Sequence, residues 1–139
     1  MNADELKARL ASVDLFDGLN KRALGQLVKG GREIKHPDGH EVITEGAGAV
    51  GFHLITGGTA RVTTGGSVRR TLGVGDYFGE ISVIDGRPRS ASVEAIENLS
   101  TLAIAPAVVN GLIEDNPAFA RRLLVLLCSR LREAERRSS

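Results

Sequence analysis

One short stretch of the chain carries the residue types from which an anion-binding site is built. Gly79 is followed directly by the carboxylate of Glu80, and Arg89 comes nine residues later with the small residues Ser90 and Ala91 behind it. A glycine lets the backbone approach a ligand closely, and a guanidinium group matches two oxygens of a phosphate. The carboxylate would accept a hydrogen bond from a hydroxyl group. This spacing therefore fits a ligand with one phosphate and a nearby hydroxyl.

Two arginines flank Pro88, and geometry alone does not choose between Arg87 and Arg89 for the phosphate. We favour Arg89, because the small residues that follow it leave room for a phosphate and supply an amide and a hydroxyl group. The short apolar turn after Glu80 adds amides at its N-terminal end, which face negative charge favourably. A buried Glu–Arg pair without any ligand is the alternative interpretation.

The elements that must position this stretch are short β-strands. Glycine is abundant, with 17 residues among 139, and it is concentrated between Gly46 and Gly86. β-rich segments are predicted at 33–35, 41–44, 52–56, 60–63, 68–72, 92–96 and 100–104, and glycine-containing turns such as Gly57-Gly58 separate them. Strands at this spacing predict a β-sandwich or a barrel-like roll. The sequence Thr64-Gly65-Gly66-Ser67 is the clearest hairpin turn.

Helices are predicted on both sides of the β-rich region. The first spans 2–14, where Asn2 and Glu5 have the spacing of a capping box, and the second runs from Asn20 to about Lys29. A short helix is expected at 106–113, and the last begins at Asn116-Pro117 and continues to about residue 136. The last helix is ~30 Å long, which suggests that part of it packs on a ligand or on another chain.

The stretch from Phe78 to Val93 resembles the phosphate-binding cassette of cyclic nucleotide-binding domains. Such domains occur in regulatory subunits of cyclic-AMP-dependent kinase, catabolite-activator-type bacterial regulators and cyclic-nucleotide-gated channels. The lead-in from Gly75 and the pattern around Phe52 match as well. The resemblance implies an α+β, mainly β fold, namely an eight-stranded antiparallel, jelly-roll-like β-roll with N-terminal helices and a long C-terminal lid helix. Residues 1–139 are then one domain, with N-terminal helices at 2–30, the roll at 31–104 and C-terminal helices at 105–136.

The resemblance also implies roles for individual residues. Glu80 would contact the ribose 2′-hydroxyl and Arg89 the cyclic phosphate. Ser90 leans towards cyclic AMP as the ligand, with cyclic GMP possible. The remaining expected ligand-binding residues are Phe78, Gly79, Ile81, Ser82 and Ala91 around ribose and phosphate, and Val62 and Leu72 against the base. Arg130 is expected to cover the base or to reach the phosphate, unless it is a solvated helix arginine. The chain departs from its relatives at Arg70, Ala134 and Glu135, near the expected base.

These features favour a cyclic nucleotide sensor, a regulatory and not an enzymatic module of signal transduction, in which ligand binding moves the C-terminal helix. The alternative is a β-roll that serves dimerisation or interaction without nucleotide.

A metal-dependent enzyme is weakly suggested by His36, His40 and His53, but their spacing is not that of a metal cupin, so no metal is expected. Expected partners are the nucleotide and a second copy or an effector at the last helix. The net charge of +1, the single cysteine and the lack of an apolar run of membrane-spanning length fit a cytoplasmic protein without nucleic-acid or membrane contacts.

Overall fold

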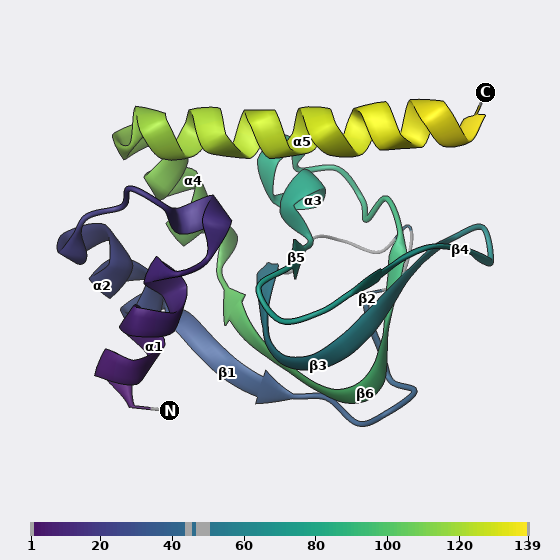
Figure 1. Ribbon diagram of the computed structural model, residues 1–139, viewed down its shortest axis with the longest axis horizontal. Helices are drawn as coiled ribbons and strands as arrows, with labels where there is room; N and C mark the ends of the chain where they lie inside the picture. The colour runs from purple at the N-terminus through teal and green to yellow at the C-terminus, as the bar shows by residue number, and fades with distance from the viewer. Residues whose placement is uncertain (1, 44–45, 47–50, 139) are drawn as a thin grey trace. The chain divides into compact units, whose positions relative to one another are not determined.

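A computed structural model of the chain describes residues 2–43, 46 and 51–138 (Figure 1). The contacts divide the chain into two compact units, Lys29–Asn110 and Met1–Val28 with Gly111–Ser139. The first unit contains all the strands described below, and the second is helical. Helix α4 (Pro106–Asp115) joins one unit to the other along the chain.

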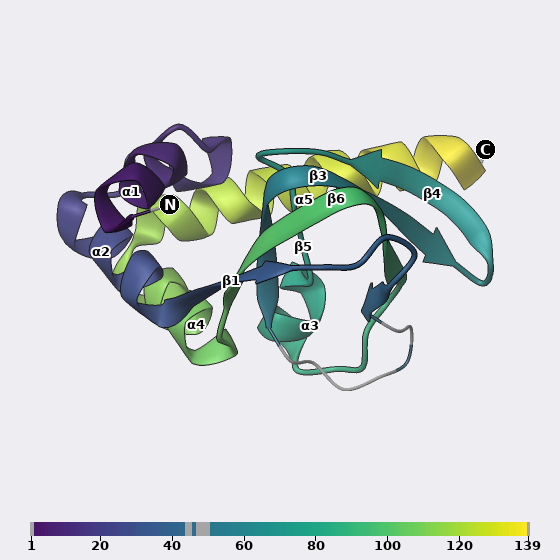
Figure 2. The ribbon, with the colours of Figure 1, turned by 90° about the horizontal axis from the view of Figure 1, so that it is seen from below.

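An antiparallel sheet forms the larger unit. Its strands are β1 (Gly31–Lys35), β2 (Glu41–Ile43), β3 (Phe52–Thr64), β4 (Ser67–Leu72), β5 (Tyr77–Phe78) and β6 (Ser92–Ile104). The strand order is β1-β6-β3-β4, while β2 pairs with β6 and β5 pairs with β3. Figures 1 and 2 show β3 and β6 running side by side as one long curved ribbon. The predicted mainly β, antiparallel fold is thereby confirmed.

The described part of the chain has six strands, and not the eight that we expected. The predicted strands 52–56 and 60–63 are one continuous strand, β3, and 92–96 and 100–104 are likewise one strand, β6. The predicted turn at Gly57-Gly58 is therefore wrong. Instead the register shifts there, and Gly58 has φ +74°, so that a Cβ atom would lie 2.2 Å from the carbonyl oxygen of Glu97. The glycine permits a β-bulge that bends the ribbon without ending the strand.

The β3–β4 hairpin has the predicted turn. Gly65 and Gly66 both have positive φ, +58° and +80°, as a two-residue type I′ turn requires. Further along the hairpin Val62 pairs with Arg70, whereas Thr63 pairs with Val68. Arg69 is therefore the extra residue of a second bulge. The predicted strand 41–44 corresponds to β2 (Glu41–Ile43), and Thr44 lies outside the described residues.

The second unit is built from α1 (Ala3–Ala11), the 3-10 helix η1 (Asp14–Phe16), α2 (Lys21–Gly30) and α5 (Pro117–Ser138). Asn2 caps α1, because its Oδ1 accepts a hydrogen bond from the Glu5 amide (2.8 Å). This helix ends at Ala11, and the predicted remainder to residue 14 leads into η1. Phe16 of η1 stacks on Phe119 of α5 with ring centroids 6.0 Å apart. Among the described residues, no helix combines the length and apolar character that crossing a membrane requires.

Candidate functional site

The segment after β5 forms a tight turn and a single short helix. Gly79 has φ +88° and is the residue before α3 (Glu80–Asp85), and Gly86 has φ +70° and ends it. Both glycines adopt a left-handed conformation that other residues rarely take. The Gly86 amide donates to the carbonyl oxygen of Ser82 (2.9 Å), and Asp85 Oδ1 accepts a hydrogen bond from the Arg87 amide (2.9 Å). The chain thus reverses immediately after the helix and returns towards Arg89.

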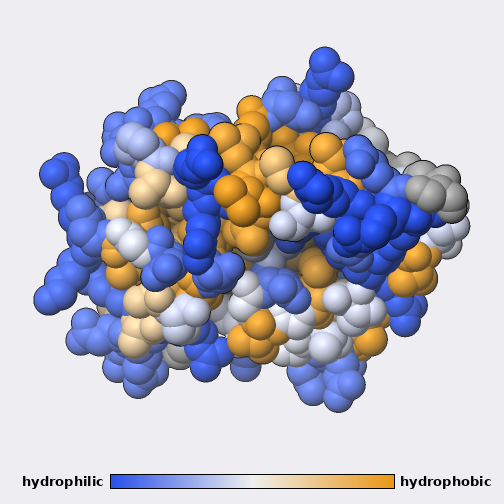
Figure 3. Space-filling model, turned by 45° about the horizontal axis from the view of Figure 1, so that its top comes forward, coloured by the Kyte–Doolittle hydropathy of each residue, from blue (hydrophilic) through white to orange (hydrophobic). Residues whose placement is uncertain are grey.

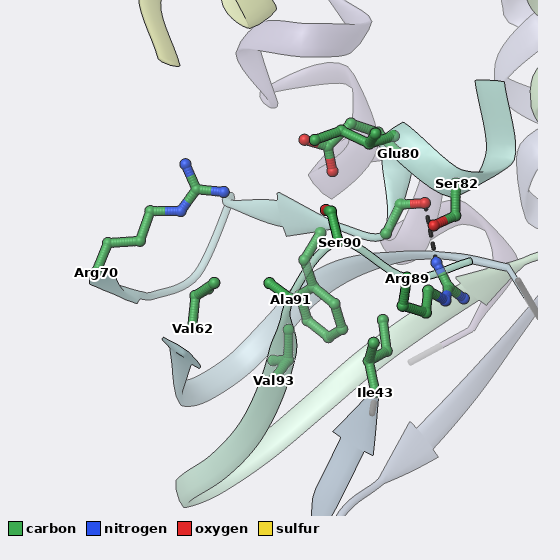
Figure 4. A pocket seen from close by; sticks show the side chains of 12 residues that line it. Ile43, Val62, Arg70, Glu80, Ser82, Arg89, Ser90, Ala91 and Val93 are labelled. Carbon is green, nitrogen blue, oxygen red and sulfur yellow. Dashed lines mark hydrogen bonds between the residues drawn. The ribbon is translucent and has the colours of Figure 1, made fainter. Parts of the chain in front are cut away.

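Arg89 is buried beside this turn, with only 5% of its surface exposed. Its Nη1 atom donates to the carbonyl oxygen of Gly79 (3.1 Å), a bond marked in Figure 4. Its Nη2 atom donates to the carbonyl oxygen of Gly51 (2.8 Å). A Cβ atom on Gly79 would lie 2.7 Å from the Gly51 oxygen and 2.9 Å from Arg89 Nη1. The missing side chain at position 79 is therefore what lets the guanidinium group come so close to the backbone.

Glu80 and Ser82 bring further polar groups to the same place. Glu80 is 3% exposed and Ser82 2%. Burial lowers the pKa of Arg89, while the carboxylate of Glu80 acts in the opposite direction. Because arginine is not deprotonated in proteins, a buried positive charge and a buried carboxylate lie near each other. Buried charged groups that converge beside a pocket make this arrangement a candidate for binding a polar ligand.

A pocket opens beside these residues, with an empty volume of about 370 Å³ that includes the solvent at its mouth. Figure 4 shows Arg89 and Ser82 on one side of the pocket, Arg70 and Val62 on the other, and Ser90 and Ala91 between them. The lining residues are Ile43, Val62, Arg70, Phe78, Gly79, Glu80, Ile81, Ser82, Arg89, Ser90, Ala91 and Val93. Its apolar walls and its few buried polar groups are typical of sites for small molecules.

The sequence profile of the cyclic nucleotide-binding domain matches residues 33–116, which include the sheet, the turn at Gly79 and Arg89. The chain belongs to the cyclic nucleotide-binding domain family. Because it belongs to this family, the chain is a regulatory ligand-binding domain. The resemblance that the sequence indicated is thereby confirmed.

Individual relatives of this cyclic nucleotide-binding domain are bacterial regulators. The cyclic AMP receptor protein of Thermus thermophilus is 33% identical over 126 residues, which cover 87% of this chain and 58% of the relative. The CRP-like cAMP-activated global transcriptional regulator of Mycobacterium tuberculosis is 28% identical over 128 residues, covering 88% and 57%. The crystal structure of the Thermus thermophilus catabolite activator protein matches with a TM-score of 0.76 and 32% identity, over 88% of this chain and 60% of that one. The domain thus spans somewhat more than half the length of these relatives.

Most of the site residues predicted from the sequence line the pocket of this cyclic nucleotide-binding domain. Leu72 is an exception, because it belongs to the core cluster but is not one of the residues that line the pocket. Arg130 lies on α5 in the other unit, so its contact with a ligand stays a prediction. The residues brought to the pocket are Val62, Phe78, Gly79, Glu80, Ile81, Ser82, Arg89, Ser90 and Ala91.

Sequence reasoning missed several members of the site. Gly51 was not anticipated, although its carbonyl oxygen holds Arg89. Ile43 was assigned to a strand without a role in the pocket, and Arg70 was placed near the expected base as a departure from the family but not among the ligand-binding residues. The signal for Arg70 was present in the alternation of β4, where Leu72 is buried and Thr71 is exposed.

The histidines behind the pocket form a small network. Thr101 Oγ1 is fully buried and lies 2.9 Å from His36 Nε2 and 3.0 Å from His53 Nδ1. The His53 ring stacks on Phe78, with centroids 4.9 Å apart and planes at 6°. Burial, together with His36 and Arg89, lowers the pKa of His53 to about 4. Within the described ranges, no group of three or more His, Cys, Asp or Glu side chains is arranged to hold a metal. Through its stacking on Phe78, His53 supports the residue that leads into the turn at Gly79.

Proposed function

We propose that this chain is a cytoplasmic regulatory module that binds a purine 3′,5′-cyclic nucleotide, with cyclic AMP as the first candidate. The observation that carries the proposal is the buried Arg89, which lies beside the left-handed turn at Gly79 and the buried carboxylate of Glu80. A cyclic phosphate bears one negative charge, which the guanidinium group would offset with charge-assisted hydrogen bonds. Membership of the family supports the same class of ligand.

The lining residues would divide the ligand between them. Arg89 binds the phosphate oxygens, with the hydroxyl of Ser90 and the backbone of Ala91 beside them. Glu80 accepts a hydrogen bond from the ribose 2′-hydroxyl, and the backbone at Gly79, Ile81 and Ser82 frames the sugar. The base lies against the apolar part of the pocket that includes Val62. In this arrangement each buried charged group has a polar partner on the ligand.

Cyclic AMP is preferred as the first candidate for two reasons. The two bacterial relatives described above are named for cyclic AMP. In addition, the resemblance to the family implies that a serine at position 90 favours cyclic AMP. Cyclic GMP is the alternative, because both nucleotides share the ribose and the cyclic phosphate that Glu80 and Arg89 would contact.

Ligand binding would be transmitted through α3 to the C-terminal helices. Asn110 Nδ2 of α4 donates to the carbonyl oxygen of Val83 in α3 (3.4 Å), so a shift of α3 changes the support of α4. A nucleotide that favours one position of α3 would bias α4 through this contact, and the chain continues from α4 into α5. The effect is a coupling between the nucleotide and whatever contacts the last helix.

The surface of α5 offers a contact for a second copy or an effector protein. Leu124, Cys128 and Leu131 follow one another at i, i+4 and i+7, and all three are exposed. Residues at this spacing form one stripe of a helix. Figure 3 shows hydrophobic side chains exposed among charged ones on the face that it presents. Sedimentation analysis of the wild type and of a Leu124→Glu/Leu131→Glu variant would test for a homodimer, which the variant should lose.

Calorimetric titration with cyclic AMP, cyclic GMP and linear 5′-AMP tests the proposed ligand. We expect at least one cyclic nucleotide to bind, and 5′-AMP to bind much more weakly, because its dianionic phosphate is not held in the ring. A thermal shift that grows with the concentration of the cyclic nucleotide is the independent readout. Absence of binding by both cyclic nucleotides would contradict the proposal and favour an interaction module that needs no nucleotide.

A further inference from the structure

Two histidines and a threonine form a hydrogen-bonded network behind the pocket. The hydroxyl oxygen of Thr101 in β6 lies 2.9 Å from His36 Nε2 and 3.0 Å from His53 Nδ1, and Thr101 is fully buried. His53 in β3 also stacks on Phe78 of β5, with ring centroids 4.9 Å apart, and Phe78 lines the pocket. A single aromatic ring therefore links this network to the proposed ligand site.

The hydroxyl group of Thr101 limits how many protons the two rings can hold. A hydroxyl group has one hydrogen to donate, and a neutral histidine has one N–H group and one bare nitrogen. With both rings neutral, one ring nitrogen donates to the hydroxyl oxygen and the other accepts from it. One added proton keeps this pattern, because a charged ring can still be the donor. A second proton would make both rings donors and place two positive charges side by side, so His36 and His53 together form a site for one proton.

The groups around His53 decide how readily it holds this proton. Burial, and then His36 and Arg89, lower the pKa of His53 to about 4. Burial, and to a smaller extent His40, which stacks on His36, lowers the pKa of His36 as well. The residues that face His53 from the neighbouring strands are neutral, namely Phe78 of β5 and Thr101 and Ala103 of β6. Arg89 is thus the group through which the pocket acts on His53.

An anionic ligand at Arg89 would change the electrostatic potential at His53. In the free protein the guanidinium group opposes a proton on His53, and the Glu80 carboxylate acts on Arg89 in turn. A cyclic phosphate bound to Arg89 would bring one more negative charge to the same place. A negative charge nearby favours the charged form of a histidine, so the bound phosphate offsets the effect of Arg89 and raises the pKa of His53.

We propose that nucleotide binding draws a proton into the His36–Thr101–His53 network, so that the network tightens binding as the pH falls. The inference rests on the proposed function. Its sign follows from linkage, because the state that binds more protons is the state that acid favours. The cyclic phosphate is a diester that keeps its single charge throughout this pH range, so the proton is taken up by the protein and not by the phosphate.

Histidine ring resonances in NMR spectra report the pKa of His53 directly in the wild-type protein. The pKa would be measured in the free protein and with saturating cyclic AMP or cyclic GMP. We expect it to rise from about 4 to about 5 in the complex, as for one added charge near a partly buried group. The signals of the three histidines are assigned by the loss of one signal in each of His36→Gln, His40→Gln and His53→Gln.

Calorimetric titrations in two buffers with different heats of ionisation count the protons taken up on binding. For these two pKa values we expect the wild type to take up about 0.4 proton at pH 5 and almost none at pH 7.5. His53→Gln should lose the uptake at pH 5. His40→Gln is the matched control at an exposed histidine, and it should keep the uptake.

A pKa of His53 that stays the same or falls when the nucleotide binds would overturn the coupling while leaving the proposed function intact. An equal proton uptake by the wild type and His53→Gln would overturn it as well, because another group, such as Glu80, would then take up the proton. If the wild type binds neither cyclic nucleotide at pH 7.5, the proposed function itself fails, and the coupling fails with it.

Discussion

The guanidinium group of Arg89 donates a hydrogen bond to the carbonyl oxygen of Gly79, the residue that precedes α3 (3.1 Å). The same side chain that we propose as the phosphate ligand therefore also holds the backbone of the turn. Loss of Arg89 would remove a ligand contact and a structural contact together. Binding and stability must be measured side by side for every change at this site.

Arg89→Ala should weaken cyclic nucleotide binding at least about tenfold, because a hydrogen bond to a charged group is worth ~1.5–3 kcal/mol. The free energy of unfolding should also fall by about 1–3 kcal/mol, since two buried carbonyl oxygens lose a donor. Calorimetry and urea unfolding measure the two effects. Arg87→Ala is the matched control at an exposed arginine two residues away. Equal affinity of Arg89→Ala and the wild type would show that Arg89 does not bind the phosphate.

Gly79→Ala should be much more damaging than Gly86→Ala, although both residues have left-handed backbones with φ +88° and +70°. Each substitution introduces strain of about 1–2 kcal/mol. Only at position 79 does the new Cβ atom also meet the Gly51 oxygen at 2.7 Å, whereas nothing lies within 4 Å at position 86. Urea unfolding of the two variants isolates the cost of this close approach, and nucleotide titration shows whether the displaced guanidinium group still binds. Equal destabilisation would argue that the turn relaxes freely.

Glu80→Gln tests the contact with the ribose through a double-mutant cycle. The wild type should bind 2′-deoxy cyclic AMP about tenfold more weakly than cyclic AMP, because the buried carboxylate loses its hydroxyl partner. The Glu80→Gln variant should bind both ligands with similar affinity, since the charge-assisted hydrogen bond is already absent. The prediction is contradicted if the penalty for removing the 2′-hydroxyl is the same in both proteins.

The free energy of unfolding should decrease as the pH falls below about 6.5, because of His53. The pKa of this residue is lowered to about 4 in the folded protein, from its ordinary value of 6.5, so the unfolded chain binds more protons between these two values. Stability from this source is complete above pH 6.5 and is lost as the pH falls towards 4. We expect the free energy of unfolding to be about 2 kcal/mol lower at pH 5 than at pH 7.5 from this group alone.

The contribution of His53 can be separated from that of other titrating groups by substitution. The pKa of His36 is also lowered, mainly by burial, and acts in the same direction. His53→Gln should reduce the pH dependence measured by urea unfolding, whereas His40→Gln, at an exposed histidine, should largely retain it. A pH dependence that is unchanged in His53→Gln would mean that the buried ring is not the group that titrates.

Local signals in the sequence predicted the parts of the fold that short-range chemistry decides. The Gly65-Gly66 hairpin and the cap at Asn2 formed as expected, because each depends on residues within three positions of one another. The cassette was located for a similar reason, since Gly79, Glu80 and Arg89 lie close together along the chain. Their meeting in one pocket follows from the short helix and the turn at Gly86.

Contacts between distant residues decided what the sequence could not show. A glycine with positive φ fits a turn and a β-bulge equally well. At Gly58 the nearby backbone of Glu97, 39 positions later in the sequence, makes the site a bulge. Asn98 opposite it adopts φ 49° without any glycine to signal this. Strand β5 has two residues and exists through its pairing with His53 and Leu54. Gly51 likewise acquires its role only when the fold brings its carbonyl oxygen to Arg89.

Arg89 also forms hydrogen bonds with two glycines that are distant from it in the sequence, Gly46 and Gly51. Its carbonyl oxygen accepts a hydrogen bond from the Gly46 amide (2.8 Å), and its side chain donates to the Gly51 carbonyl oxygen (2.8 Å). One residue thus contacts both glycines, one through its backbone and the other through its side chain. Substitution of the Arg89 side chain would therefore release Gly51 but keep the contact with Gly46, because that contact is made by the backbone of residue 89.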